Sequence, residues 1–255
     1  MAPTEHGREN AVSRFFGERP DSVRKETMTE LIVALDVGDL KKEEVLLKNL
    51  KGTVHFYKIG LKLFISEGKK AVEMVHHYDG KVFLDLKLLD IPQTVAGAVK
   101  EAGKLGVESI SVHLSGGPEM IRAAAAISPR PKLWGVSVLT SFRKEDVRIF
   151  HERASLPSLV KNWAHLGVKN GADAIVCSGH EVEFLRRTLK NFSPKFVTPG
   201  IRPAGEKIHD QKRVMTPEEA GALGIDFIVV GRPIIEAKDP RAAAEKILNA
   251  VKSIK

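Results

Sequence analysis

Short apolar runs alternate with stretches of helical periodicity from residue 31 almost to the end of the chain. Eight runs have the length and the β-branched content of strands, and the segments between them repeat apolar residues at helical spacing. Near-continuous apolar strands separated by helices indicate a parallel sheet that is covered on its faces. The strand candidates are 31–37, 54–60, 81–87, 108–114, 133–139, 172–178, 195–200 and 226–231, and helices are expected within 94–106, 118–127, 158–171 and 240–254.

Eight strands with roughly eight helical connections in about 225 residues predict an α/β fold, the (β/α)8 or TIM barrel. A doubly wound open sheet is the alternative, but no GxGxxG motif opens its first helix. Residues 1–27 are polar and lack clear periodicity, so we expect a flexible N-terminal extension followed by a single barrel domain over 28–255. The extension has no apolar core typical of a signal peptide.

Composition narrows the classes of function. Charged residues make up 28% and hydrophobic residues 43% of the chain, as in soluble proteins, and no apolar stretch is long enough to cross a membrane. The single cysteine, Cys177, excludes an internal disulfide and a cysteine metal cluster, and its apolar neighbours predict a packed core thiol. A cytoplasmic location fits these features.

The net charge of +8 raises the question of an anionic partner. Nucleic-acid binding would be better supported by a basic stripe with interleaved aromatic residues, whereas aromatics are only 6% and the lysines and arginines are scattered. We therefore expect no nucleic acid and prefer a small anionic substrate, with a merely solvated basic surface as the alternative.

Charged residues gather where the predicted strands end. The first two strands end near Asp36 and Lys58, and the third ends with Asp85 and Lys87, with Asp90 in the following loop. Residues two apart on a strand face the same side, and barrel active sites lie at the C-terminal ends of the strands. Asp36 alone could be a helix N-cap, but four charges at one barrel mouth predict a functional ion network.

Further polar residues follow the later strands, and each has an ordinary structural explanation. His113 alone fits a hydrogen-bonded core histidine, Thr140 and Ser141 could cap the next helix, and Arg202 could be a surface arginine. Burial disfavours the charged form of a lysine, whereas adjacent carboxylates favour it. Lys87 is therefore expected to be an ammonium that donates a proton, because an imine-forming lysine must be neutral.

The loops after the last two strands predict a phosphate site. They read TPGIRPAG and VVGRPI, and barrels often bind phosphate at this place. Gly200 and Gly231 let backbone N–H groups approach an anion. Arg202 and Arg232 supply cationic side chains that match phosphate oxygens.

The segment FLDLKLLDIPQTV resembles the DxKxxDIPxT signature of the orotidine 5′-monophosphate decarboxylase family, bacterial type, which makes UMP in the last step of de novo pyrimidine nucleotide synthesis. The resemblance runs from about Leu31 to Ile254. It includes, in chain order, the segments ALDV, YKIG, HLSGG, VLTS, VTPGIRP, DQKRVMTP and VVGRPI.

This resemblance implies a homodimer in which Lys58, Asp85 and Lys87 form an alternating network with the partner's Asp90. It implies that Lys87 protonates C6 of the pyrimidine as CO2 leaves. It assigns no role to His113. The other substrate-binding residues that it implies are Asp36 with Lys58 at the ribose, Ile91 and Thr94 at the ribose of the partner's site, Thr140 at the base, and Arg202, Gln211, Gly231 and Arg232 around the phosphate, with Pro199 as a further substrate-binding residue.

The resemblance implies no metal, flavin or pyridoxal phosphate, in agreement with the lack of HExxH, cysteine-cluster and P-loop motifs. Residues 203–214 are the candidate lid. Two rivals remain open: a magnesium-dependent sugar-phosphate decarboxylase or synthase of the same superfamily, and a non-catalytic barrel that binds phosphate or RNA. The IPQT, VLTS and DQKRV segments favour the nucleotide enzyme over the first.

Overall fold

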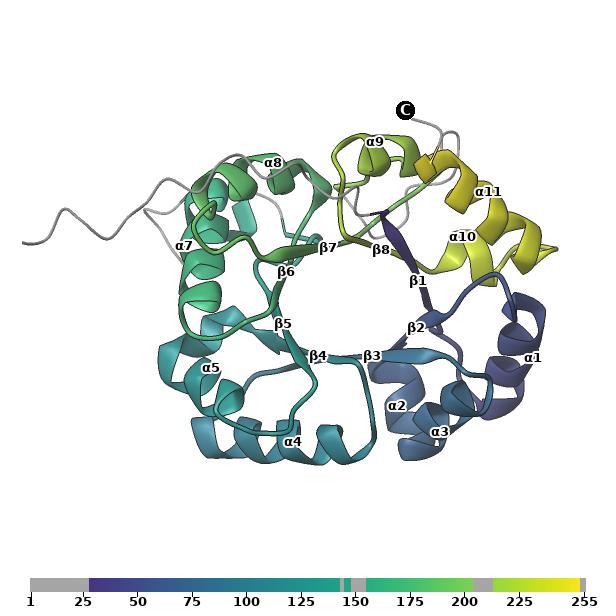
Figure 1. Ribbon diagram of the computed structural model, residues 1–255, viewed down its shortest axis with the longest axis horizontal. Coiled ribbons are helices and arrows are strands. Elements are labelled where there is room, and N and C mark those ends of the chain that lie inside the picture. The colour runs from purple at the N-terminus through teal and green to yellow at the C-terminus, as the bar shows by residue number, and fades with distance from the viewer. Residues whose placement is uncertain (1–27, 143–144, 148–154, 204–212, 253–255) are drawn as a thin grey trace, which may run out of the picture.

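The computed structural model describes residues 28–142, 145–147, 155–203 and 213–252, and shows a closed barrel of eight parallel strands (Figure 1). The strands pair in chain order, and β8 closes the barrel on β1. The predicted TIM barrel is confirmed, while the predicted extension 1–27 lies outside the described residues. The strands are β1 Glu30–Ala34, β2 Phe56–Gly60, β3 Lys81–Leu88, β4 Ser109–His113, β5 Lys132–Val136, β6 Ala174–Val176, β7 Lys195–Pro199 and β8 Phe227–Val230.

Helices form the outer ring around these strands, as Figure 1 shows. The four helices expected from sequence correspond to α4, α5, α7 and α11, with ends that differ by a few residues. Pro92 begins α4 because proline has no backbone N–H to lose at the first helical position. The helices are α1 Leu40–Leu50, α2 Leu61–Glu67, α3 Lys69–His77, α4 Pro92–Lys104, α5 Gly117–Ala125, α7 Leu156–Lys169, α8 Gly179–Thr188, α9 Pro217–Ala222, α10 Arg232–Ile235 and α11 Pro240–Lys252, with a 3-10 turn at Leu114–Gly116.

The interior of the barrel is closed by an aromatic cluster, which we call the floor. Trp134 lies at its centre, with ring centroids 4.3 Å from Phe83 and 5.0 Å from Phe227, and Phe56 packs beside them. Trp134, Phe56 and Phe83 are almost completely buried. The floor fills the barrel with side chains, so a substrate can enter only above it.

The strands change from apolar to polar on the same inward side. Phe56 belongs to the floor, and Lys58 follows two residues later on β2. Phe83 belongs to the floor, and Asp85 follows two residues later on β3. Because side chains two apart share a face of a strand, the strands that build the floor also raise the charged side chains above it.

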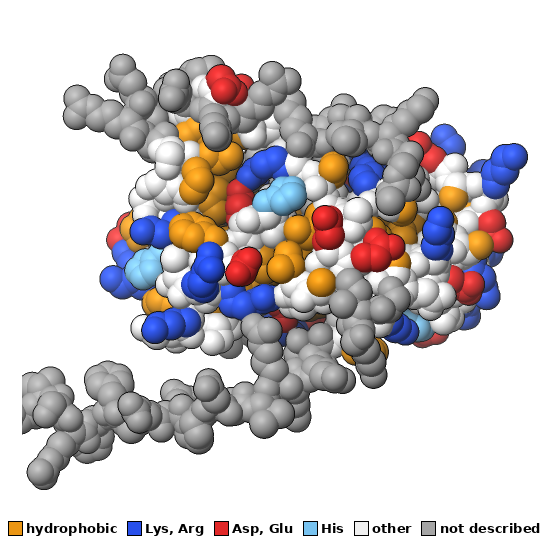
Figure 2. Space-filling model, turned by 90° about the horizontal axis from the view of Figure 1, so that it is seen from above, with side chains coloured by type: hydrophobic (Ala, Val, Ile, Leu, Met, Phe, Trp, Pro, Cys, Tyr) orange, Lys and Arg blue, Asp and Glu red, His pale blue; other side chains and the backbone are white. Residues whose placement is uncertain are grey.

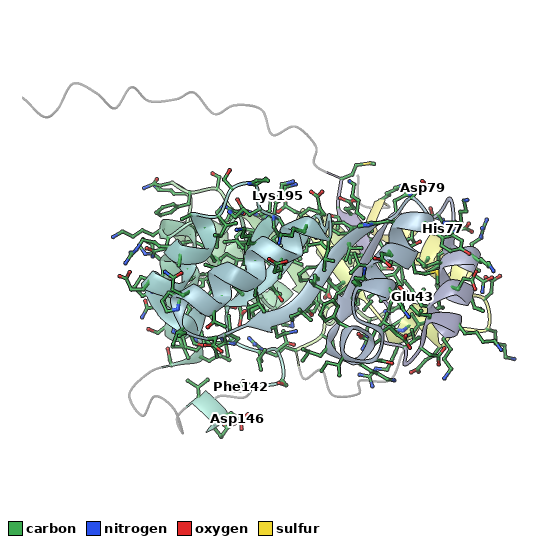
Figure 3. The ribbon with its side chains drawn as sticks, turned by 90° about the horizontal axis from the view of Figure 1, so that it is seen from below. Glu43, His77, Asp79, Phe142, Asp146 and Lys195 are labelled. Carbon is green, nitrogen blue, oxygen red and sulfur yellow. The ribbon has the colours of Figure 1, made fainter. Side chains whose placement is uncertain are left out.

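A second apolar layer lies between the barrel and the helices, and Glu43 is an exception within it. The buried positions of α1 are Glu43, Leu46, Leu47 and Leu50, the spacing of one helix face. Burial, with a smaller effect from Glu67, raises the pKa of Glu43 to about 8. Glu43 (Figure 3) is therefore mostly protonated at neutral pH, which removes the cost of a buried charge.

The outer surface carries charges of both signs. On the face shown in Figure 2, lysine and arginine side chains are interspersed with aspartate and glutamate. Within the described ranges, no helix is both long and apolar enough to cross a membrane.

Candidate active site

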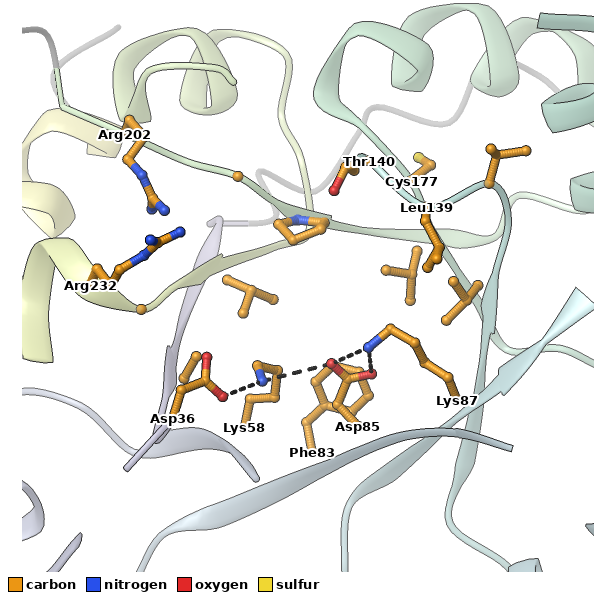
Figure 4. Close-up of a pocket in the computed structure, with 18 residues that line it drawn as sticks. Asp36, Lys58, Phe83, Asp85, Lys87, Leu139, Thr140, Cys177, Arg202 and Arg232 are labelled. Atoms are coloured by element: carbon orange, nitrogen blue, oxygen red, sulfur yellow. Dashed lines mark hydrogen bonds and ion pairs between the residues drawn. The ribbon is translucent and has the colours of Figure 1, made fainter. Parts of the chain in front are cut away.

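A cavity of about 270 Å³ opens above the floor, at the C-terminal ends of the strands (Figure 4). Charged side chains line one wall and apolar side chains line much of the rest. The lining residues are Ala34, Asp36, Lys58, Phe83, Asp85, Lys87, Val136, Val138, Leu139, Thr140, Val176, Cys177, Pro199, Gly200, Arg202, Val229, Gly231 and Arg232. Most of the site residues predicted from sequence are thus brought together.

The four predicted charges form one row in which acid and base alternate (Figure 4). Lys58 Nζ lies 3.0 Å from Asp36 Oδ1 and 3.7 Å from Asp85 Oδ2. Lys87 Nζ lies 2.9 Å from each carboxylate oxygen of Asp85. Asp85 and Lys87 lie on β3, Lys58 lies on β2, and Asp36 lies two residues after the end of β1. It confirms the predicted convergence of these side chains.

Asp85 is the most enclosed carboxylate of the row, with a side chain that is 13% exposed. Burial raises its pKa, but the ammonium groups of Lys58 and Lys87 outweigh that effect, and the net result is a lowered pKa. The Ser111 hydroxyl also donates to Asp85 Oδ1 at 2.8 Å. Asp85 therefore remains a carboxylate, fixed between two lysines.

Lys87 reaches the row from an irregular stretch of β3. The pairing of β3 with β4 shifts between Leu84 and Leu88, and Lys87 has a φ of 52°, a left-handed value that non-glycine residues seldom adopt. The same Ser111 hydroxyl accepts the Lys87 backbone N–H at 2.8 Å. Ser111 therefore holds both the backbone of the lysine and the carboxylate that faces its ammonium group.

Sequence reasoning missed Ser111 and Gly60. Ser111 could have been found because Ser109, Ser111 and His113 alternate along β4, which indicates a polar inward face. Gly60 is needed for space, since a Cβ atom there would lie 2.8 Å from Lys58 Nζ and 3.1 Å from Asp36 Oδ1. A larger residue would push the row apart.

Two arginines lie at the end of the cavity near Asp36, and Lys87 and Leu139 lie toward the other end (Figure 4). Arg202 is 8% exposed. Arg232 follows Gly231 at the start of α10. Gly200 has a φ of 81°, where a side chain would be strained. This end has the cationic character predicted for a phosphate site.

The remaining predicted substrate-binding residues of the cavity are placed as follows. Pro199 and Thr140 line the cavity, as expected, and Thr140 lies across it from the arginines (Figure 4). Gln211 lies outside the described residues, as does the 204–212 part of the candidate lid 203–214.

The loop after β3 contributes no residue to the lining of this chain's own cavity. Asp90, Ile91 and Thr94 are exposed and do not line it. The Asp90 carboxylate accepts the Ile91 backbone N–H at 2.6 Å. Leu89 and Ile91 are 56% and 67% exposed, so apolar surface flanks Asp90. Asp90 is the one member of the predicted network that does not join the row.

His113 and Cys177 have pKa values that burial shifts. His113 lies 2.7 Å from the Ser115 hydroxyl through Nδ1, and burial, with a smaller effect from Lys87, lowers its pKa. Cys177 is buried, as predicted, and also lines the cavity, where burial raises the pKa of its thiol well above the usual value. In the part of the chain that the structure describes, no three His, Cys, Asp or Glu side chains cluster as metal ligands.

Fold and site together define a (β/α)8-barrel enzyme with a row of charges facing a cationic pocket end. Residues 29–247 match the model of the family described as orotidine 5′-phosphate decarboxylase / HUMPS, and the chain belongs to this family.

Relatives and solved structures agree with this assignment. The chain is 41% identical over 248 residues to orotidine 5′-phosphate decarboxylase of Moorella thermoacetica, covering 92% of this chain and 97% of that one. It is 40% identical over 237 residues to the Trichlorobacter lovleyi protein of the same name, covering 89% and 97%. The crystal structure of the Lactobacillus acidophilus decarboxylase superposes with a TM-score of 0.75 at 34% identity, covering 88% of this chain and all of that one.

Proposed function

We propose that this chain converts orotidine 5′-monophosphate to UMP and CO2, with Lys87 as the proton donor. The C6–carboxylate bond breaks, CO2 leaves, and the electron pair stays on C6. The Lys87 ammonium then transfers a proton to C6, and the neutral amine regains a proton from solvent. The observation that carries the proposal is the alternating row of Asp36, Lys58, Asp85 and Lys87 above the floor.

The row supports this chemistry because its charges are held in place before the substrate arrives. An ammonium beside a developing carbanion stabilises it most when little solvent reorganisation is needed. Asp85 accepts bonds from Lys87 and Ser111, so both charges of the pair are positioned by the fold. We propose that Asp85 also repels the substrate carboxylate, and that Asp36 and Lys58 bind the ribose.

The arginine end of the cavity is the proposed phosphate site, and Arg232→Ala tests it. Loss of a charge-assisted bond to phosphate is expected to lower kcat/KM for the nucleotide roughly 10- to 100-fold. Turnover of orotidine, which lacks the phosphate, should change less than about threefold on the same principle. Arg187→Ala, which removes an exposed arginine paired with Glu183, is the matched control. Equal losses of kcat/KM on both substrates would contradict the assignment of Arg232 to the phosphate site.

We further propose a homodimer in which residues 90–94 complete the partner's site. Asp90, Ile91 and Thr94 are exposed and do not line their own cavity, yet Asp90 lies only three residues after Lys87. Exposed Leu89 and Ile91 supply apolar surface that a partner would cover. In this arrangement the partner's Asp90 extends the row beyond Lys87, and its Ile91 and Thr94 lie by the ribose.

The function is tested by following orotidylate absorbance after addition of the full chain, with and without EDTA. Rapid loss with formation of UMP, unaffected by EDTA, is the expected result. A folded chain that leaves orotidylate unchanged would overturn the proposal. Turnover that EDTA abolishes would instead favour the magnesium-dependent sugar-phosphate class.

A further inference from the structure

The chain passes the arginine end of the cavity twice. It leaves along Gly200–Pro203 and is next described from Arg213, where it returns beside the same stretch. The Arg202 backbone N–H donates to the Met215 carbonyl at 2.9 Å, and the Met215 N–H donates to the Gly200 carbonyl at 3.3 Å. The position of Arg202 therefore depends on where the returning segment, residues 213–215, is held.

Arg213 holds the returning segment against α8 and against the backbone at Leu139. Its guanidinium forms a close ion pair with Glu181 in the first turn of α8, where the two side chains are 17% and 12% exposed. Its second terminal nitrogen donates to the Leu139 carbonyl at 3.3 Å. Glu181 is itself fixed, because its other carboxylate oxygen accepts the Ser178 backbone N–H at 3.1 Å.

These contacts join both ends of the cavity, although Arg213 and Glu181 do not line it. Leu139 precedes Thr140, the residue that the family resemblance assigns to the base, and both line the cavity. Gly200 and Arg202 line the phosphate end. The Arg213 guanidinium is thus a direct link between the backbone beside Thr140 and the segment that holds Arg202.

We propose that Arg213 and Glu181 are a positioning pair that sets the separation between the base end and the phosphate end of the cavity. The inference rests on the proposed function. A nucleotide must contact both ends at once, so its binding depends on their separation. A nucleoside without phosphate contacts only the base end and the row of charges, so it does not depend on that separation.

The test compares Arg213→Gln with the parent chain on orotidine 5′-monophosphate and on orotidine. Displacement of one binding element by about 1 Å can cost roughly a hundredfold in rate. We therefore expect kcat/KM for the nucleotide to fall roughly a hundredfold and that for orotidine less than about threefold. Arg213→Lys keeps the positive charge but loses the guanidinium group that reaches two acceptors at once. Its kcat/KM for the nucleotide should lie between those of the parent chain and Arg213→Gln.

Arg186→Gln is the matched control, because Arg186 also lies partly buried on α8 but donates to the carbonyls of Leu223 and Gly224, away from the cavity. Arg186→Gln should lower the unfolding temperature, but it should change kcat/KM for the nucleotide and for orotidine by the same factor.

A double-mutant cycle distinguishes positioning from direct phosphate contact. In an Arg202→Ala background, Arg213→Gln should lower kcat/KM for the nucleotide by a much smaller factor than it does in the parent chain. In an Arg232→Ala background, it should lower kcat/KM by the same factor as in the parent chain.

Three results would overturn the inference. Arg213→Gln could lower kcat/KM equally for both substrates, or it could fold and lower neither. Arg186→Gln could also lower kcat/KM for the nucleotide selectively, as Arg213→Gln is expected to do. If Arg213→Gln does not fold, Arg213→Lys carries the same comparison. The parent chain is measured first, so its failure to decarboxylate the nucleotide would refute the proposed function, whereas failure of the variants alone would refute only the positioning pair.

Discussion

A Lys87→Ala variant is expected to bind the nucleotide but to lose decarboxylation by a factor of roughly 10⁴ or more. The substitution removes the only proposed proton donor and leaves Asp85 with Lys58 as its remaining ammonium partner, 3.7 Å away. The measurement is kcat from steady-state kinetics, with UMP affinity measured separately. Loss of kcat with retained affinity is the result that a proton donor requires.

Lys104→Ala is the control for this variant, since Lys104 is an exposed lysine on α4 that pairs with Glu101 outside the cavity. Thermal unfolding of both variants separates loss of chemistry from loss of fold. A Lys87→Ala protein that turns over within tenfold of the parent would exclude Lys87 as the proton donor. The row of charges would then need another catalytic role.

Mixing inactive Lys87→Ala subunits with inactive Asp90→Ala subunits is expected to restore about a quarter of the parent activity. In a symmetric dimer with shared sites, a heterodimer has one site that carries both substitutions and one that carries neither. At equal amounts about half of the dimers are mixed, and each has one intact site, which gives the quarter. The measurement is activity after subunit exchange, with exchange followed by mass spectrometry.

Lys87→Ala mixed with Asp85→Ala is the control, because both residues lie in the same chain's row and no mixed dimer regains an intact site. Activity from that mixture would show that the rescue has another cause. Demonstrated exchange without any recovery in the Lys87 and Asp90 mixture would argue that Asp90 acts within its own chain or not at all.

The barrel and the row of charges were predictable because both depend on patterns local to each strand. Apolar runs of strand length marked β1 to β8, and the two-residue spacing placed Asp85 and Lys87 on one side. The order of the strands then brought Asp36 and Lys58 beside them. None of these steps required knowledge of a contact between distant segments.

The missed residues act through contacts between segments far apart in the sequence, and Ser111 is the one of them with a local signal, the alternation of polar residues along β4. Ser111 matters because a shift in strand pairing places its hydroxyl between the Lys87 backbone and Asp85. Gly60 matters because Lys58 and Asp36 meet directly above it. Arg213 lies 32 positions after the partner that it pairs with, Glu181. Such contacts become visible only when the strands and loops are assembled.

The left-handed backbone at Lys87 limits how this chemistry can be transplanted. A designer who copies only the Asp-x-Lys spacing onto a regular strand of another barrel would reproduce the two side chains but not the irregular, left-handed backbone that directs the ammonium group. The smallest part to transfer is the pair of strands β3 and β4 with Ser111 included, because the Ser111 hydroxyl accepts a hydrogen bond from the Lys87 backbone N–H at 2.8 Å. Grafts that lack the second strand should yield a lysine without a defined direction.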